Sequence, residues 1–194
     1  RLADPVEGKI LIGGLALESV NRTSRTERIR MVPQDGFMFD ATLGENIAMG
    51  LVGANIDDVR ASITELGLET WVAGLPRGLD TEVGERGEGL SVGERQLVAL
   101  ARAQMADPGL LILDEATSAL DYDTERRVCD NLLDNLDHCT VFFITHRLTT
   151  VQPADLIVLM DRGAVMEAGT HQELMARRGW YFALYQSQQQ EQGI

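Results

Sequence analysis

The sequence predicts an α/β fold with a mostly parallel sheet and an inserted helical segment. In the first and last thirds of the chain, short apolar runs end in polar residues and, in the last third, are separated by a helical pattern, as in sheets built from strand, helix and strand. Between about residues 42 and 106, apolar residues instead recur at helical spacing. With 194 residues and 44% hydrophobic content, the chain is large enough for one such domain with a buried core.

Residues 1–41 predict strand, loop and strand, which form the first part of the sheet core. The stretch "GKILIGGLAL" alternates in polarity and contains a pair of glycines. The stretch "RIRMVPQD" then runs from an apolar segment into a Pro-Gln-Asp corner. Gln34 is therefore expected in the loop after the second strand.

Residues 42–106 predict a helical subdomain. Val59, Ile63 and Leu66 fall on one helical face, and Gly67 is placed to end that helix. The stretch "LETWVAGLP" predicts a second short helix that breaks at its proline. The glycine-rich stretch "VGERGEGLSVGE" interrupts the helical pattern before a last, longer helix.

That longer helix begins at "LSVGERQ". Ser91 can cap the helix, Glu94 can reach back as its partner in a capping box, and Gly93 leaves backbone room at the first turn. A helix start of this kind binds anions readily. An ordinary capped helix explains the same residues when the motif is taken alone.

Residues 107–194 predict the rest of the core. Leu110 to Leu113 are continuously apolar, as in a strand buried on both faces of a parallel sheet, and "TVFFIT" predicts the next buried strand. Between them, one apolar helical face comprises Val128, Leu132, Leu133 and Leu136. The stretches "DLIVLM", "DRG" and "AVMEAG" then predict a hairpin. Thr170 and Glu173 predict a capping box that opens a terminal helix, and we expect the polar tail after it to fray.

Composition excludes several classes of protein. No apolar run approaches the roughly 18 to 20 residues that cross a bilayer, and the polar start "RLADPVEGK" is unlike a signal peptide. The missing initiator Met suggests a piece of a longer protein. A net charge of −13 argues against a nucleic-acid surface. Cys129 and Cys139 have no disulfide or metal spacing, so we expect a reducing, cytosolic setting.

Polar residues follow the predicted strands at the edge where open α/β sheets bind ligands. Asp114 can bind Mg²⁺ directly or through water, and Glu115 can orient or deprotonate an attacking water. His146 can donate a hydrogen bond to phosphate charge, and Gln34 can contact a metal or its water from a loop. Taken singly, each residue is more typical of an ordinary structural position.

The order of these motifs resembles the nucleotide-binding domain of ABC transporters over nearly the whole chain. Five motifs carry the resemblance: the Q-loop (Gln34), the signature (Ser91 to Glu94), the Walker B pair (Asp114 and Glu115), the D-loop (Ser118 to Asp121) and the switch histidine (His146). The stretches "TLGENI" and "TEVGERG" are similar to the exporter branch of that family. The resemblance implies a P-loop NTPase-like core that carries a helical subdomain.

The resemblance also implies a reaction, the attack of water on the γ-phosphate of ATP in the presence of Mg²⁺. Asp114 and Gln34 would hold the metal. Glu115 would polarise the water, and His146 would steady the γ-phosphate. Gln34 would in addition sense the nucleotide near the contact with the membrane-spanning domain.

In the family, two such domains pair head to tail, and each nucleotide lies between them. Ser91, Gly93 and Glu94 would therefore contact the partner's ATP, and Asp121 would link the two sites. The signature of the family has a second glycine and a glutamine where this chain has Val92 and Glu94. Because the backbone amide, Ser91 and Gly93 remain, we expect function to be retained.

One family motif is missing from the 194 residues. A phosphate loop needs G-x-x-x-x-G-K-[ST], but the only Gly-Lys pair, Gly8 and Lys9, is followed by Ile10 and has Ala3 in place of the first glycine. The first strands, the phosphate loop and the aromatic residue that stacks on adenine are therefore expected upstream. Without that loop, residues 1–194 alone are expected to bind ATP poorly.

Two functions follow from these observations. The first is the ATP-hydrolysing part of an exporter at the cytoplasmic face of a membrane, with a second nucleotide-binding domain and a membrane-spanning domain as partners. The second is a non-catalytic, degenerate domain that supplies only the signature face to a complete partner. Chromosome-structure ATPases share two of the motifs, but Gln34 and Ser91 are too close for their inserted coiled coil. The sequence indicates neither the transported substrate nor whether the pair is a homodimer.

Overall fold

The computed structural model describes residues 3–136 and 138–191. Its contacts divide the chain into two compact units, Arg1–Phe142 and Phe143–Ile194, and each unit is described by itself. The finer division at residues 41 and 106 stays a prediction.

The first unit begins with a small hairpin and a helix. Strands β1 (Leu11–Ile12) and β2 (Leu15–Ala16) pair antiparallel, a 3-10 turn follows (Leu17–Ser19), and α1 (Arg22–Arg28) leads into the sheet. The prediction of strand, loop and strand was wrong here, because it missed α1. This helix has no apolar periodicity and no buried residue, and it is started by the Asn21 side chain, which accepts a hydrogen bond from the Ser24 amide at 2.8 Å.

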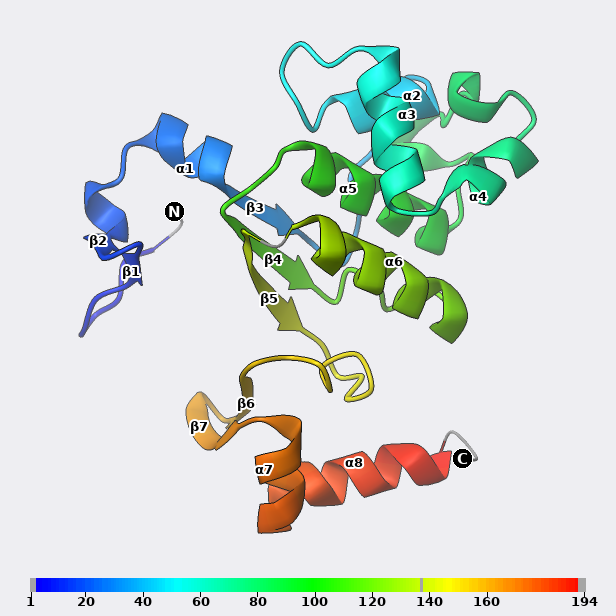
Figure 1. Cartoon of the computed structure of the whole chain (residues 1–194). Coiled ribbons are helices and arrows are strands. Elements are labelled where there is room, and N and C mark those ends of the chain that lie inside the picture. Colours follow the sequence, from blue (N-terminus) through cyan, green and yellow to red (C-terminus); the bar gives the residue numbers. More distant parts are fainter. Residues whose placement is uncertain (1–2, 137, 192–194) are drawn as a thin grey trace. The chain divides into compact units, whose positions relative to one another are not determined.

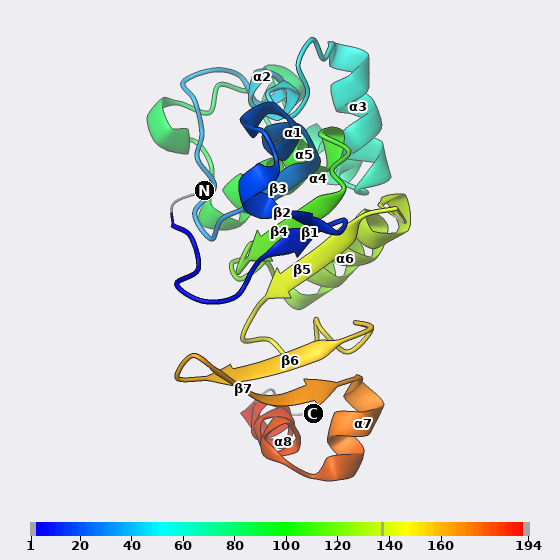
Figure 2. The same ribbon diagram turned by 90° about the vertical axis from the view of Figure 1, so that its left-hand side faces the viewer.

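The sheet of the first unit has the strand order β3-β4-β5 (Ile29–Val32, Leu110–Asp114 and Thr140–Ile144). Strands β3 and β4 run parallel, with Ile29 opposite Leu110. Helices α5 (Val92–Met105) and α6 (Tyr122–Asn135) lie on one side of this sheet (Figures 1 and 2). The α/β fold with a parallel sheet is therefore confirmed.

Burial differs between the two predicted core strands. In β4, Leu111 and Leu113 are buried under the helices. In β5, every second residue is exposed, and Phe142 is 58% exposed. The prediction that "TVFFIT" forms a buried strand was therefore wrong as to burial, since no residue from Thr140 to Ile144 is buried.

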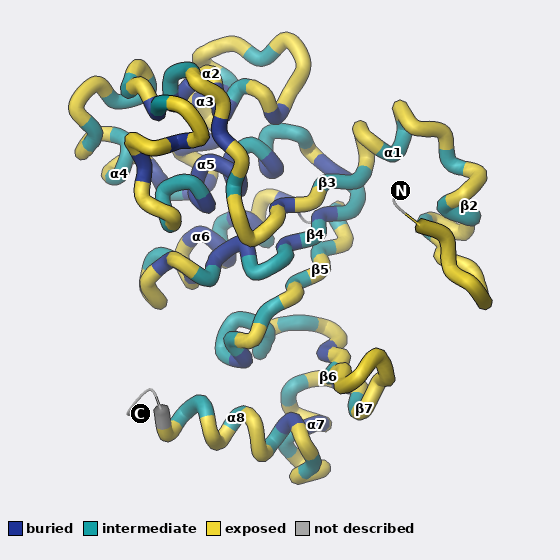
Figure 3. The backbone as a smooth tube through the Cα atoms, turned by 180° about the vertical axis from the view of Figure 1, so that it is seen from behind, coloured by how far each residue is buried: buried dark blue, intermediate teal, exposed yellow. Residues whose placement is uncertain are grey.

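The region predicted as a helical subdomain is mostly helical. It comprises α2 (Leu43–Ala48), α3 (Ile56–Glu65), α4 (Glu69–Gly74), two 3-10 turns (Gly78–Asp80 and Glu85–Gly87) and α5. Val59 and Ile63 are buried, Leu66 follows the last turn of α3, and Gly67 takes the left-handed conformation (φ +67°) that ends the helix. Figure 3 shows the buried positions gathered along α5, β4 and the adjoining side of α6.

The second unit contains the predicted hairpin and two helices. Strands β6 (Ile157–Asp161) and β7 (Ala164–Gly169) pair antiparallel, and α7 (His171–Arg177) and α8 (Trp180–Glu191) follow. The capping box of Thr170 and Glu173 is confirmed. The core cluster of this unit comprises Leu148, Ile157, Leu174 and Tyr181.

The polar tail differs from its prediction. We expected it to fray after the terminal helix, but α8 continues to Glu191, and residues 192–194 lie outside the described residues. Within residues 3–136 and 138–191, the structure has no helix with the length and apolar character that crossing a bilayer requires.

Candidate functional site

The ends of β3 and β4 bring two predicted site residues into contact. Gln34 lies two residues after β3, and Glu115 directly follows Asp114, the last residue of β4. Because parallel neighbours end at the same edge of a sheet, residues 81 positions apart meet there: Gln34 Nε2 donates a hydrogen bond to Glu115 Oε2 at 2.8 Å. This contact fixes the direction of the Glu115 carboxylate.

The backbone of Glu115 is unusual. Its φ of +48° lies in the left-handed region, which residues other than glycine, asparagine and aspartate seldom adopt. The chain therefore turns sharply out of β4 at Glu115.

Behind these residues lies Gln96, which the sequence reasoning did not identify. Its side chain is 1% exposed, and its amide nitrogen lies 3.1 Å from the Gln34 carbonyl, 3.3 Å from the Glu115 carbonyl and 3.3 Å from Ser118 Oγ. Its amide oxygen accepts a hydrogen bond from the Ala119 N–H at 3.0 Å. The signal for Gln96 was an amide side chain directly before the apolar run of α5, since a buried polar side chain needs partners.

The start of α5 forms the capping box that the sequence predicted. Ser91 Oγ donates to Glu94 Oε2 at 2.7 Å and accepts from the Glu94 amide at 3.2 Å. Glu94 Oε1 also accepts a hydrogen bond from the Trp71 indole of α4 at 3.0 Å, a contact that sequence spacing does not reveal. Burial is the largest influence on the pKa of Glu94 and raises it, but the hydrogen bonds from Trp71 and Ser91 together lower that pKa below 4.5.

The first turn of α5 packs directly on the segment 118–121. A Cβ atom on Gly93 would lie 3.0 Å from the Ala119 carbonyl oxygen, so a side chain at this position would push the two segments apart. At the end of the segment, Asp121 Oδ1 accepts from the Thr124 amide at 3.0 Å and caps α6. The backbone and side-chain hydrogen bonds from Thr124 lower the pKa of Asp121.

His146 lies in the second unit, two residues after β5. Gln188 of α8 holds the backbone at His146 and two residues after it. Its Nε2 donates to the His146 carbonyl, and its Oε1 accepts from the Leu148 amide at 3.0 Å. Because the other predicted residues belong to the first unit, the proximity of His146 to Glu115 stays a prediction.

The residues present fit a magnesium ion in their chemistry. Among residues 3–136 and 138–191, no cluster of three or more His, Cys, Asp or Glu is placed to hold a metal. Mg²⁺ does not need such a cluster, because it binds through one or two carboxylates, phosphate oxygens and water. The carboxylate of Asp114 and the amide oxygen of Gln34 are hard ligands of the required kind, and the Gln34 nitrogen already faces Glu115.

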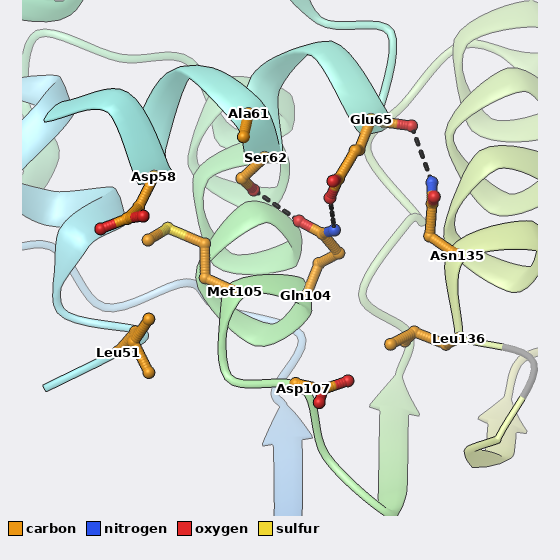
Figure 4. A pocket seen from close by; sticks show the side chains of 10 residues that line it. All are labelled: Leu51, Asp58, Ala61, Ser62, Glu65, Gln104, Met105, Asp107, Asn135 and Leu136. Atoms are coloured by element: carbon orange, nitrogen blue, oxygen red, sulfur yellow. Dashed lines mark hydrogen bonds between the residues drawn. The ribbon is translucent and has the colours of Figure 1, made fainter. Parts of the chain in front are cut away.

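A separate pocket of about 330 Å³ lies between α3, α5 and α6 (Figure 4). Its lining contains none of the predicted site residues. The side chains of Ser62, Glu65 and Gln104 close a hydrogen-bond network along one wall, where Ser62 donates to Gln104 at 2.6 Å. The pocket is therefore a feature of helix packing at the far end of α5.

The chain is similar to known proteins along nearly its whole length. The family described as "ABC transporter" matches residues 1–118. The probable multidrug resistance ABC transporter ATP-binding/permease protein YheI of Bacillus subtilis is 43% identical over 185 residues, which are 95% of this chain and 32% of that protein. The ATM1-type heavy metal exporter of Novosphingobium aromaticivorans is 42% identical over 191 residues, which are 98% of this chain and 31% of that protein.

A solved structure has the same fold. The structure of a bacterial Atm1-family ABC exporter with ATP bound superposes with a TM-score of 0.91 at 42% identity, covering 95% of this chain and 33% of that one. The chain thus spans about a third of the length of the relatives that it matches.

Proposed function

The chain belongs to the ABC transporter family, as part of an ATP-binding domain of the exporter type. We propose that, within the intact protein, this domain hydrolyses ATP to power export across a membrane. The observation that carries this proposal is the contact of Gln34 with Glu115 at the carboxyl ends of two parallel strands. We propose a second nucleotide-binding domain and a membrane-spanning domain as partners, and the cytoplasmic face of the membrane as its place.

In this mechanism, water attacks the γ-phosphate in line, and the bond from that phosphorus to the oxygen of ADP breaks. Glu115 accepts the proton of the water, and the hydrogen bond from Gln34 holds its carboxylate in one direction. His146 donates a hydrogen bond to the γ-phosphate. Asp114 and Gln34 would hold Mg²⁺ through their oxygens, and the ion would supply positive charge for the phosphate oxygens.

The start of α5 is proposed to face the nucleotide of the partner domain. Ser91 is exposed there, and the N-terminus of a helix carries a partial positive charge that suits phosphate. Gly93 and Glu94 shape the same turn, and Asp121 lies on the segment against which that turn packs. Asp121 is proposed to carry the connection between the two sites of the pair.

Glu115→Gln in the full-length protein tests the proposal. We expect ATP binding to be retained and turnover to fall by about 100-fold or more, because the amide keeps the size of the side chain but cannot accept the proton. The measurements are nucleotide affinity by calorimetry and steady-state release of phosphate. Glu27→Gln, at an exposed position of α1, is the control with the same chemical change and is expected to hydrolyse ATP like the wild type.

Wild-type turnover in Glu115→Gln would exclude the role given to Glu115. A full-length wild-type protein that binds a complete partner domain but does not hydrolyse ATP would instead favour the non-catalytic module.

A further inference from the structure

We propose that Gln96 is a positioning residue, which joins the start of α5 to Gln34, Glu115 and the segment 118–121. The inference rests on the proposed function, since it concerns the residues that would direct the attacking water. Gln96 would maintain the geometry of Gln34 and Glu115 without itself contacting the nucleotide.

The hydrogen bonds of Gln96 use the whole amide. Its nitrogen faces three acceptors at 3.1 to 3.3 Å, and its oxygen takes one donor at 3.0 Å. Gln96 is 1% exposed, so bulk water does not reach its amide group. Removal of the amide would therefore take this hydrogen bond from the Gln34 carbonyl and from the Ala119 N–H, and would leave the Glu115 carbonyl with the Ser118 N–H, which lies 3.1 Å away.

These partners come from two separate parts of the chain. Gln34 is 62 residues from Gln96, and Ser118 is 22 residues away on the other side. Neither segment is a regular helix or strand at these positions. The amide of Gln96 thus fixes loops that the sheet alone does not hold.

Gly93 strengthens the link between α5 and the segment 118–121. One turn before Gln96, its bare backbone lies against the Ala119 carbonyl oxygen, where a Cβ would come within 3.0 Å. Ala119 is thus contacted by α5 at both its N–H and its carbonyl. Because hydrogen bonds weaken steeply beyond about 3.5 Å, a shift of α5 by less than 1 Å would release both loops.

The same helix offers a matched control. Gln104 lies two turns further along α5, and it is also a buried glutamine with both amide atoms bonded. Its partners are Ser62 and Glu65 of α3 (Figure 4), neither of which belongs to the proposed site. Methionine replaces glutamine at nearly constant shape, so Gln96→Met and Gln104→Met differ mainly in the partners that they leave unpaired.

In the full-length protein, we expect Gln96→Met to lower kcat by about 10- to 100-fold with the KM for ATP changed less than about twofold. Gln104→Met is expected to lower the Tm about as much as Gln96→Met does, but to keep kcat near the wild-type value. Gln96→Asn, which keeps an amide but moves it by one bond, is expected to lower kcat as well, and it serves if the methionine variant does not fold. Wild-type kcat in both Gln96 variants would overturn the proposal.

Hydrogen exchange gives a second measurement that needs no ATP turnover. The Ala119 amide should exchange faster in Gln96→Met and in Gln96→Asn, whereas Gln104→Met should leave it unchanged. Unchanged exchange across residues 116–120 in both Gln96 variants would overturn the inference. If the wild type shows no turnover, the proposed function fails, and the exchange result still decides whether Gln96 positions these loops.

Discussion

The two units hold their proposed catalytic loops with the same chemical group in different surroundings. In the first unit, the Gln96 amide is buried and binds the backbone beside Gln34 and Glu115. In the second, the Gln188 amide is only partly buried and binds the His146 carbonyl and the Leu148 N–H.

This difference indicates how far each loop depends on its glutamine. Water cannot readily enter the space of a buried amide, so loss of its hydrogen bonds costs about 1 to 3 kcal/mol. Water can take the place of an amide that is partly exposed. The first unit should therefore be sensitive to any loss of a buried polar side chain, and the second should be more tolerant.

The largest expected effect concerns Arg102. It tests whether the first unit is sensitive to the loss of a polar side chain that bonds to the backbone. Its guanidinium donates to the Phe37 carbonyl at 2.7 Å and to the Asn46 carbonyl at 2.7 Å, and burial lowers its pKa. Arg102→Met should lower the free energy of unfolding by about 2 to 4 kcal/mol, because the carbonyls lose a charged donor. Denaturant unfolding measures this change.

Arg60→Met is the control for that measurement. Arg60 lies on α3 with 66% of its side chain exposed, and it pairs with Asp57 at 3.2 Å. An exposed pair of this kind contributes less than about 1 kcal/mol. Equal losses in the two variants would contradict the view that buried polar contacts hold the first unit together.

A smaller effect is expected for Gln188→Met in the second unit. Loss of the two backbone contacts should let the His146 loop move, so kcat should fall by about 3- to 10-fold while the free energy of unfolding changes by less than about 1 kcal/mol. Gln186→Met, at an exposed position of the same helix, should match the wild type. A loss of kcat as large as that of Gln96→Met would show that the burial of the glutamine does not determine how strongly its replacement affects kcat.

The smallest effect concerns Trp71→Phe, which removes a partly exposed hydrogen bond within the first unit. The hydrogen bond from the neutral indole lowers the pKa of Glu94. Its bond to the ionised carboxylate therefore stabilises the fold above about pH 4.5, and this stability is lost as pH falls through the lowered pKa. The variant should be less stable by about 1 kcal/mol at neutral pH and approach the wild type in acid. Unfolding curves at several pH values test this, and a difference independent of pH would assign the effect to packing.

Periodicity and turn chemistry were sufficient to predict much of the fold. The run from Leu110 to Leu113 predicted β4, the spacing from Val59 to Leu66 predicted α3, and the pairs Ser91 with Glu94 and Thr170 with Glu173 predicted two capping boxes. Each of these signals is local, so the residues that determine the structure lie within one or two turns of each other.

Contacts between distant segments could not be predicted in this way. The polar helix α1 has no apolar face, so no periodicity marks it. The partners of Gln96 and Trp71 come from elements that only the tertiary fold brings together. Of the candidate site, sequence order predicted that Gln34 and Glu115 belong together, but not the buried amide behind them.

At Glu115, the left-handed backbone and the need for a carboxylate favour different amino acids. Asparagine adopts this conformation more readily than glutamate, so Glu115→Asn would relax the turn out of β4. It would also shorten the side chain and remove the carboxylate that Gln34 contacts. If the proposed chemistry holds, activity requires a strained residue here at a cost in stability, and a search for thermostable variants should leave this position untouched.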